Sequence, residues 1–223
     1  MKKRNLGKSG VQVSEIGFGG EWLERHPEEH SIELIKYAHS CGINIIDCWM
    51  PDPKSRDIIG KAIKDNRESW YVQGHLGSTW QNGQYVRTRD VNKVRVAFED
   101  LLRRLQTDYI DIGMIHYVDT VEDWECLQNS DFLKYVIEMK EKGVIHHIGM
   151  SSHDPKTAAL AVKTGLIEML LFSVNPAFDM LPSGQDLDKL LGDGYVYDSG
   201  LAGINAAVLG GDGDNGAVCG SGQ

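Results

Sequence analysis

The stretch Gly42-Ile43-Asn44-Ile45-Ile46-Asp47-Cys48-Trp49-Met50-Pro51-Asp52 is an apolar run that ends at a carboxylate and then meets a proline. A short run with apolar residues on both faces is typical of a strand in a parallel sheet, because both faces of such a sheet are covered. In folds of this kind the first polar residue after a strand often takes part in chemistry. Asp47 is therefore a candidate site residue, although an Asp at a strand end also commonly caps the following helix or begins a turn.

The same pattern recurs along the chain. Expected strands cover residues 11–18, 43–46, 70–75, 109–115, 144–150 and 168–174. Expected helices cover residues 31–41, 55–64, 90–105, 121–141 and 155–163, and residues 77–87 are expected to form a polar loop. Strict alternation of strands and helices predicts an α/β fold with a parallel sheet, and no G-x-G-x-x-G follows the first strand to favour a doubly wound dinucleotide fold. We therefore predict a (β/α)8 TIM-barrel type, complete or cut short after about six units.

The chain has 223 residues, and its composition changes near its end. Residues 1–182 form the predicted barrel domain. Residues 183–223 are rich in Gly and Asp and carry no Lys or Arg after Lys189, so we expect a flexible or foreign C-terminal tail there. The Gly-Asp repeats lack the spacing and the closing Glu of an EF-hand.

The composition, with 41% hydrophobic and 25% charged residues, is that of a soluble globular protein without a membrane span. The net charge is −9, and the basic residues are scattered, which argues against a nucleic-acid or anionic-membrane surface. No apolar signal segment follows the basic start, so a cytoplasmic location is expected. The four cysteines show no close pairing, so we expect reduced thiols.

Polar or small residues stand at the end of every predicted strand. In a parallel barrel all carboxyl ends open on one face, so these residues would surround one pocket that takes a small-molecule substrate. Two tryptophans, Trp22 and Trp49, fall in loops at the same end, where flat rings either line a substrate site or only cover a core. The strand-end residues are Gly19, Glu21, Asp47, His75, His116, Ser151 and Asn175.

Several of these stretches resemble the aldo/keto reductase family. Arg4-Asn5-Leu6-Gly7-Lys8-Ser9-Gly10-Val11-Gln12-Val13-Ser14, continuing to Gly19-Gly20, is similar to the amino-terminal strands of the family, and Gly42-Ile43-Asn44-Ile45-Ile46-Asp47 resembles its second barrel strand. Asp108-Tyr109-Ile110-Asp111-Ile112-Gly113-Met114-Ile115-His116 and Ile148-Gly149-Met150-Ser151-Ser152-His153 resemble the fourth and fifth. With Asn175-Pro176 the resemblance covers residues 2 to about 182. It implies a TIM-barrel oxidoreductase that uses NADP(H) on a small carbonyl or alcohol substrate.

The resemblance also implies a catalytic set of Asp, Tyr, Lys and His, which this chain matches only in part. Asp47 and His116 match two positions, whereas Asp52 stands where the family has Tyr and His75 stands where it has Lys. The implied site is therefore altered, with His75 binding or protonating the substrate oxygen and Asp52 as a secondary proton donor. On the cofactor side, Ser151, Ser152 and Asn175 are similar to residues that hold the nicotinamide carboxamide, and Gly19 and Gly20 would allow the backbone to approach the cofactor.

Two other functions remain open from the sequence. Asp47, His75 and His116 are also suitable ligands for a divalent metal ion such as Zn, Mn or Fe, which would make the protein a metal-assisted lyase, isomerase or hydrolase. The loss of the Tyr and Lys also allows a non-catalytic barrel relative used for binding or regulation.

Overall fold

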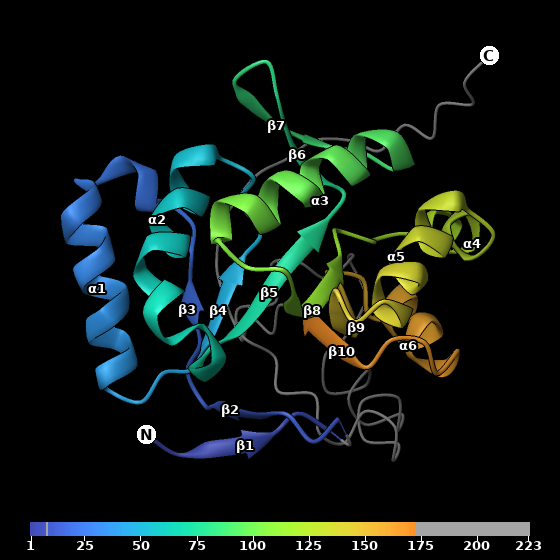
Figure 1. The fold of residues 1–223 in the computed structure, drawn as a ribbon. Helices are drawn as coiled ribbons and strands as arrows, with labels where there is room; N and C mark the ends of the chain where they lie inside the picture. The colour runs from blue at the N-terminus through green and yellow to red at the C-terminus, as the bar shows by residue number, and fades with distance from the viewer. Residues whose placement is uncertain (8, 173–223) are drawn as a thin grey trace, which may run out of the picture.

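The computed structural model describes residues 1–7 and 9–172, and its centre is a parallel sheet (Figure 1). The order β10-β9-β8-β5-β4-β3 follows the chain without reversing, as in a β/α barrel, whereas a doubly wound sheet reverses its order. The predicted fold class and the predicted number of parallel strands are confirmed. The strands are β3 (Phe18–Gly19), β4 (Ile45–Cys48), β5 (Tyr71–Leu76), β8 (Ile110–Ile115), β9 (Ile145–Ser152) and β10 (Met169–Phe172).

The helices connect these strands on the outer side of the sheet (Figure 1). Polar residues just before every described α-helix except the first start these helices, because their side chains accept a backbone N–H of the first turn. Asp90, for example, accepts from Asn92 before α3, and Asp154 accepts from Thr157 before α6. The helices are α1 (Glu28–Ser40), α2 (Pro53–Ile63), α3 (Val91–Leu105), α4 (Val121–Gln128), α5 (Asp131–Glu141) and α6 (Pro155–Lys163), with short 3₁₀ turns η1 (Leu23–Arg25) and η2 (Lys64–Ser69).

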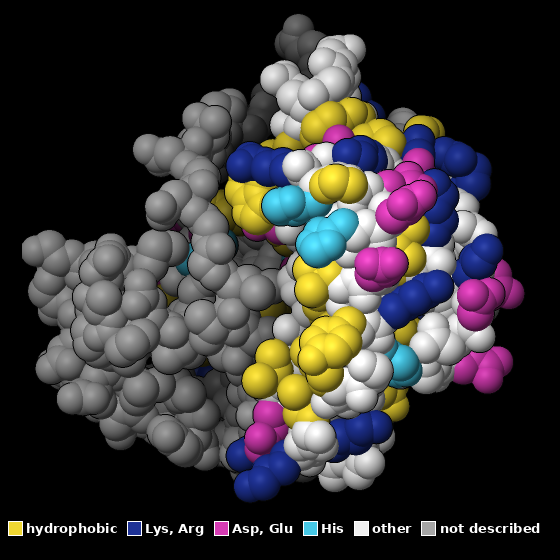
Figure 2. Space-filling model, turned by 90° about the vertical axis from the view of Figure 1, so that its left-hand side faces the viewer, with side chains coloured by type: hydrophobic (Ala, Val, Ile, Leu, Met, Phe, Trp, Pro, Cys, Tyr) yellow, Lys and Arg dark blue, Asp and Glu magenta, His cyan; other side chains and the backbone are white. Residues whose placement is uncertain are grey.

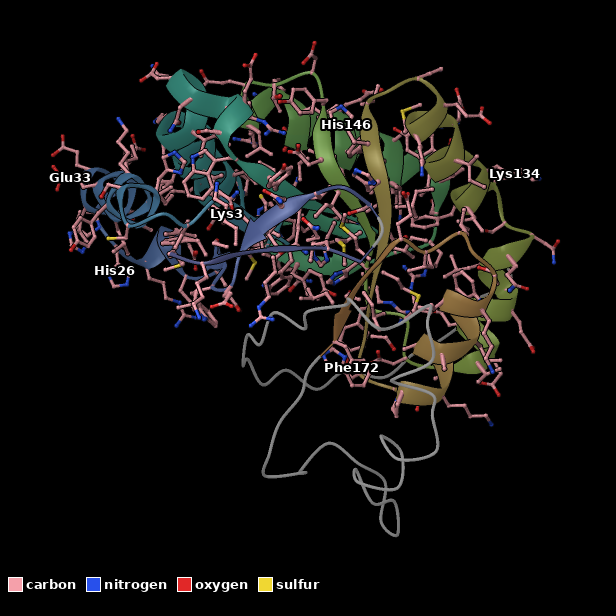
Figure 3. All side chains as sticks on the ribbon, turned by 90° about the horizontal axis from the view of Figure 1, so that it is seen from below. Lys3, His26, Glu33, Lys134, His146 and Phe172 are labelled. Atoms are coloured by element: carbon pink, nitrogen blue, oxygen red, sulfur yellow. The ribbon has the colours of Figure 1, made fainter. Side chains whose placement is uncertain are left out.

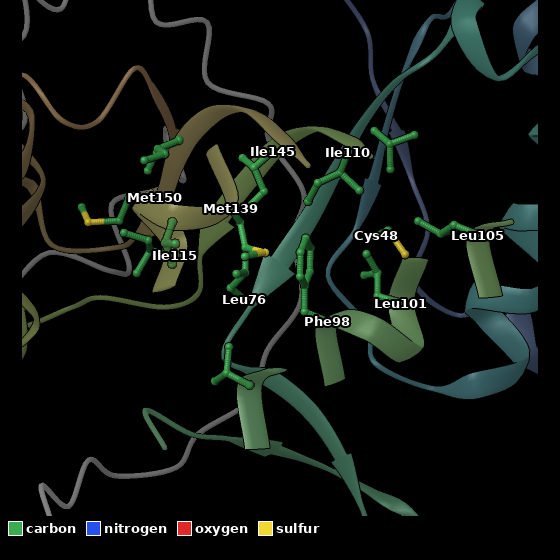
Figure 4. Close-up of a cluster of buried hydrophobic side chains, with 14 of the residues drawn as sticks. Cys48, Leu76, Phe98, Leu101, Leu105, Ile110, Ile115, Met139, Ile145 and Met150 are labelled. Atoms are coloured by element: carbon green, nitrogen blue, oxygen red, sulfur yellow. The ribbon is translucent and has the colours of Figure 1, made fainter. Parts of the chain in front are cut away.

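The main hydrophobic core lies between the helices and the outer face of the sheet. Phe98 and Leu101 of α3 lie beside Ile110 of β8 in this layer, and Ile145 of β9 continues it (Figure 4). Each such side chain is almost fully buried, which contributes about 1.5–3 kcal/mol relative to exposure. This layer fixes the strands whose carboxyl ends carry the site.

A second, smaller cluster fills the inner face of the sheet. It joins Ile45, Ile112 and Met114 to Val11 and Val13 from the start of the chain. Side chains alternate between the two faces of a strand, so Asp47 lies one inward position beyond Ile45. In the same way, His116 follows Met114. The carboxyl end of the inner face therefore receives the polar strand-end side chains.

The prediction of one strand over residues 11–18 is wrong. Gln12–Ser14 (β2) pairs antiparallel with Lys3–Asn5 (β1). This hairpin lies at the bottom of the view in Figure 1, and Figure 3, which looks from below, labels Lys3 on it. The chain bends after Ser14, whose hydroxyl donates to the carbonyl of Ile16 and whose N–H donates to Asn44. Only Phe18–Gly19 then joins the parallel sheet.

The prediction of a polar loop over residues 77–87 is also wrong, because these residues form a hairpin of β6 (Ser78–Gln81) and β7 (Gln84–Arg87). Its two-residue turn has positive φ at both positions, 52° at Asn82 and 80° at Gly83. An Asn-Gly pair with this geometry matches the twist of a two-residue hairpin. In Figure 1 the hairpin follows β5 directly and stands beyond its carboxyl end.

The long helix predicted over residues 121–141 is two helices, α4 and α5. Ser130 separates them, because its hydroxyl accepts the N–H of Leu133 and so begins a new helix. The break turns the chain between two buried anchor residues, Leu127 and Phe132.

Within residues 1–7 and 9–172, no helix is long and apolar enough to cross a bilayer. The face that carries α1 mixes acidic, basic, His and hydrophobic side chains without a single-sign patch (Figure 2). Within the described residues, Cys41 and Cys48 take part in no disulfide. Asn175, Cys219 and the predicted tail at residues 183–223 lie outside the described residues.

Candidate functional site

Three of the predicted site residues form a continuous hydrogen-bonded chain at the carboxyl end of the sheet. His75 Nε2 lies 2.9 Å from Asp47 Oδ1, and His75 Nδ1 lies 2.9 Å from His116 Nδ1. All three residues are buried, with 4–5% of their surface exposed. They come from β4, β5 and the residue after β8, which are neighbouring strands in the sheet. The predicted convergence of strand-end side chains therefore occurs for these three.

A fourth residue, Tyr85 of β7, extends the chain. Its hydroxyl lies 2.8 Å from His116 Nε2, and its ring meets the His116 ring edge-on at 5.7 Å. Tyr85 is 37% exposed, so the hydrogen-bonded chain runs from a buried carboxylate to a phenol at the surface. We refer to Asp47, His75, His116 and Tyr85 together as the relay.

The predicted substrate-lining residue Trp49 covers the relay from one side. Its ring stacks on His116 at 5.8 Å with an interplanar angle of 6°, and Tyr85 meets it edge-on at 5.6 Å. The Trp49 side chain also hydrogen-bonds to Glu21, and the Trp49 carbonyl accepts from the buried Ser78 hydroxyl. These contacts fix Trp49 between the hairpin and the loop after β3.

Arg89 holds the backbone that carries His116. Its guanidinium donates to the carbonyl of His116 at 2.8 Å and to the carbonyl of Tyr117 at 3.1 Å, while Asp123 of α4 accepts from the same guanidinium. The backbone N–H of Tyr117 donates to Ser151 Oγ at 2.7 Å. Tyr117 has a φ of 55°, a left-handed conformation that these contacts stabilise.

The surroundings of His116 and Tyr85, the two relay residues nearer the surface, favour their neutral forms. Burial lowers the pKa of His116 well below its usual value, and the nearby His75, Arg89, Arg87 and His153 lower it further. Burial also raises the pKa of the Tyr85 phenol, although Arg87 opposes this shift. His116 is therefore a neutral imidazole at physiological pH, and Tyr85 is a protonated phenol.

Burial, followed by the charges of Glu24 and Asp47, raises the pKa of Glu21, while the hydrogen bond from Trp49 opposes the shift. Glu21 contacts the site through Trp49. The described hydrogen bonds do not join it to the relay.

Four of the residues predicted to bind the cofactor are described, and they lie around the same end of the sheet: Gly19, Gly20, Ser151 and Ser152. Gly19 pairs with Asp47, and the N–H of Gly20 donates to the Asp47 carbonyl at 2.9 Å. A Cβ at Gly20 would stand 2.5 Å from that carbonyl oxygen, so Gly20 is required for the close approach of the two strands. This packing explains Gly20 without a cofactor.

The two serines differ in how their hydroxyl groups are used. Ser152 Oγ donates to the Asp154 carbonyl and accepts the Asp154 N–H, so both of its capacities are satisfied locally. Ser151 Oγ accepts from Tyr117, which leaves its own O–H to donate to a further acceptor. Ser151 therefore fits a nicotinamide carboxamide better than Ser152 does.

The structure does not bring Asp52 or Trp22 into the relay. Asp52 is the N-cap of α2, and its carboxylate accepts the N–H of Ser55 at 3.0 Å. Trp22 is 41% exposed, and the Arg25 guanidinium lies 3.4 Å from its ring centroid. Among the described residues, no hydrogen bond or ring contact joins either of them to His75 or His116.

The donor atoms that would bind a metal ion are engaged with one another. The described residues contain no group of three or more His, Cys, Asp or Glu side chains arranged to hold a metal. Both ring nitrogens of His75 and both of His116 point at relay partners. The geometry therefore supports a chain of proton donors and acceptors rather than a shared cation.

Sequence reasoning did not identify Tyr85 as a site residue. The signal that could have found it is Asn82-Gly83, because this pair favours a two-residue hairpin turn. The turn places Tyr85 opposite Trp80 and on the same strand face as Arg87. Tyr85 of β7 is thereby brought to His116, the residue after β8.

Comparisons with known proteins agree with this fold. A family model described as the aldo/keto reductase family matches residues 15–211. The oxidoreductase YqkF of Bacillus subtilis, itself described as uncharacterized, is 29% identical over 186 residues, which are 82% of this chain and 58% of that protein. The NADH-specific methylglyoxal reductase of Escherichia coli is 28% identical over 174 residues, covering 69% of this chain and 53% of that protein.

A solved structure is similar as well. The holo form of an aldo-keto reductase from Bacillus halodurans has a TM-score of 0.68 and 29% identity, over 78% of this chain and 58% of that chain. The chain therefore spans little more than half the length of each of these relatives. Because the family model matches most of its residues, the chain belongs to the aldo/keto reductase family.

Proposed function

We propose that this chain carries the catalytic end of an NAD(P)H-dependent oxidoreductase that reduces a small carbonyl compound or, in reverse, oxidises the alcohol. Family membership supports the reaction class, and the observation that carries the proposal is the buried Asp47–His75–His116 chain at the carboxyl end of the sheet. A reduction needs one proton for every hydride delivered to carbon. A chain of titratable groups that ends at the surface is suited to supply that proton.

Within the proposal, Asp47 and His75 form the proton-holding half of the site. The Asp47 carboxylate is 5% exposed at its side chain and lies against His75 Nε2, so it orients the ring and stabilises a positive charge on it. His116 then connects this pair to the outer part of the site. Asp47 and His116 are proposed in the roles that the resemblance implies, and His75 is proposed to connect them in place of the Lys.

A nicotinamide dinucleotide, when bound, would supply the hydride. Of the described residues, Ser151 is suited to donate to the carboxamide through its remaining hydroxyl hydrogen, and Asn175 is proposed as its partner from the sequence. Trp49 and Trp22 are proposed to line the substrate side. We propose NADP(H) as the cofactor, with NADH as the competing choice because a relative is named as NADH-specific.

The alternatives have weaker support. A metal-assisted reaction would need Asp47, His75 and His116 to turn away from one another, at the loss of two hydrogen bonds in a buried site. A non-catalytic role is disfavoured because four titratable side chains are aligned in one connected chain. Neither alternative explains the contact between His116 and Tyr85.

The test is a fluorescence titration of the full chain with NADPH and with NADH, followed by turnover with methylglyoxal and para-nitrobenzaldehyde. We expect a saturable change in nicotinamide fluorescence and consumption of the reduced cofactor that depends on the aldehyde. Failure of both cofactors to bind would contradict the proposal. Stoichiometric Zn, Mn or Fe in protein purified without chelator would favour the metal-assisted alternative instead.

A further inference from the structure

The hairpin phenol is placed where a proton donor for carbonyl reduction is needed. Asp47, His75 and His116 are each 4–5% exposed, whereas Tyr85 is 37% exposed. Among these four, Tyr85 is therefore the group that a substrate oxygen can reach without opening the core. Its hydroxyl is also hydrogen-bonded to the last imidazole of the chain.

The proton positions follow from the contacts when both imidazoles are neutral. The Asp47 carboxylate accepts, so His75 carries its proton on Nε2 and its Nδ1 is an acceptor. His116 must then donate through Nδ1, and its Nε2 accepts from the Tyr85 hydroxyl. In this resting arrangement every hydrogen bond of the relay points inward to Asp47.

One added proton reverses the direction of the chain. An imidazolium at His75 donates to Asp47 through Nε2 and to His116 through Nδ1. His116 then carries its proton on Nε2 and donates to the Tyr85 oxygen. The hydroxyl hydrogen of Tyr85 is now directed away from the relay and is able to donate to a substrate carbonyl.

We propose that Tyr85 of the β6–β7 hairpin is the proton donor of this site, and that the His75–His116 pair supplies it with protons. The inference rests on the proposed function. It places the reacting phenol on the hairpin after β5 rather than on the loop after β4, where Asp52 stands and caps α2.

The step balances in protons and electrons. The O–H bond of Tyr85 breaks as the substrate oxygen gains its proton, and a bound nicotinamide would supply the hydride, with its electron pair, to the carbonyl carbon. The Nε2 proton of His116 moves to the Tyr85 oxygen, and the Nδ1 proton of His75 moves to His116 Nδ1. The relay returns to its resting arrangement, and one proton from solvent restores the imidazolium.

The structure also explains how the phenol is held. The Asn82-Gly83 turn fixes the pairing of Tyr85 with Trp80, and Trp49 packs edge-on against the Tyr85 ring. Phe at position 85 keeps the ring contacts with Trp49 and His116 and lacks only the hydroxyl. The variant therefore separates proton donation from packing.

The experiment compares the wild-type chain with Y85F, D52N and Y37F. Asn is also a good N-cap, so D52N removes an acid and keeps α2 capped. Y37F is the matched control, because Tyr37 lies on α1 and is 68% exposed. The readouts are NADPH affinity by fluorescence, kcat for para-nitrobenzaldehyde, and the unfolding midpoint.

We expect Y85F to bind NADPH as the wild type does and to lose roughly 10²- to 10⁴-fold in kcat, with an unchanged unfolding midpoint. D52N and Y37F are expected to stay within about threefold of the wild type, a change too small for loss of a proton donor. A Y85F variant with wild-type kcat would overturn the inference and leave the proposed function intact. A fall in kcat in D52N but not in Y85F would have the same meaning. A wild-type chain that neither binds nor oxidises NADPH or NADH would overturn both.

Discussion

Each end of the parallel sheet contains a buried aspartate, and the two carboxylates have different kinds of partner. At the amino end, Asp111 of β8 accepts from the Arg67 guanidinium at 2.8 Å and from the Val72 N–H at 3.0 Å. At the carboxyl end, Asp47 faces His75, which in turn faces His116. One aspartate is paired with a permanent cation, and the other with imidazoles that both donate and accept hydrogen bonds.

The two aspartates are therefore expected to have different roles, one in stability and the other in proton transfer. Arg is always protonated, so the Asp111–Arg67 pair holds a fixed charge and connects η2 to the sheet. A histidine ring can donate through one nitrogen and accept through the other, so the Asp47 end can pass a proton along its chain of hydrogen bonds. The amino end is therefore expected to contribute stability and the carboxyl end to contribute reactivity.

The largest expected effect is on catalysis at the carboxyl end. In Asp47→Asn, the amide oxygen still accepts from His75 Nε2, but the charge that stabilises the imidazolium is lost. We expect kcat for aldehyde reduction to fall roughly 10²- to 10⁴-fold, with the free energy of unfolding changed by about 1 kcal/mol or less. Steady-state kinetics and urea unfolding measure the two quantities on the same preparation.

The same substitution at the amino end, Asp111→Asn, is expected to lower stability and to leave kcat nearly unchanged. Asp111→Asn leaves the Arg67 guanidinium, whose side chain is 10% exposed, without its carboxylate, which should lower the free energy of unfolding by about 3 kcal/mol. The kcat of the folded fraction should stay near the wild-type value, since Asp111 lies far along β8 from His116. Equal losses of kcat in both variants would remove the distinction between the two ends.

The pH dependence of stability gives a smaller, directional effect. The pKa of His116 in the folded chain is well below its usual value, mainly because of burial. Above the unfolded-state value of about 6.5 the contribution of His116 to stability is fully present. It is lost as the pH falls through that value toward the folded-state pKa, because only the unfolded chain then takes up the proton.

His116→Gln should remove this part of the slope, by at most about 1.4 kcal/mol per pH unit. Urea unfolding of the wild type, H116Q and the exposed-site control His26→Gln, between about pH 5 and pH 7, measures the difference. If H116Q and the wild type lose stability in parallel, His116 titrates as an ordinary surface histidine and the buried relay is contradicted.

The smallest expected effect concerns the hairpin that carries Tyr85. Gly83 has a φ of 80°, and a Cβ there would meet nothing within 4 Å, so Gly83→Ala costs only the left-handed backbone, about 1 kcal/mol. Gly143, after α5, has a φ of 73° and equally open surroundings, which makes G143A a matched control. Only G83A is expected to lower kcat, by about fivefold. Similar activity losses in both would show that the hairpin has no special role.

The sequence was sufficient for the framework of the site. Period-two alternation places Asp47 and His75 on the inner face, and the parallel order of strands brings them together with His116. These features are local or follow from topology. The Asp111–Arg67 pair at the amino end could not be predicted, because no local pattern joins two residues 44 positions apart.

Other features depend on contacts that no local pattern encodes. Tyr85 lies in a half-exposed hairpin without clear apolar alternation, so residues 77–87 have the composition of a loop. The role of Asp52 as an N-cap and the use of both Ser152 hydrogen-bonding capacities also depend on backbone geometry. In each case a polar residue has several possible partners, and tertiary packing selects one.

The central claim is that Asp47, His75, His116 and Tyr85 form one connected proton relay, and histidine-ring ¹⁵N NMR tests it most directly. A pH titration of the labelled chain, assigned with single His variants, reports the charge and tautomer of each ring. We predict that His116 stays neutral to well below pH 6.5 and changes from the Nδ1–H to the Nε2–H tautomer when His75 becomes charged. A His116 tautomer that ignores the charge of His75, or an imidazolium at His116 near pH 6.5, would contradict the relay.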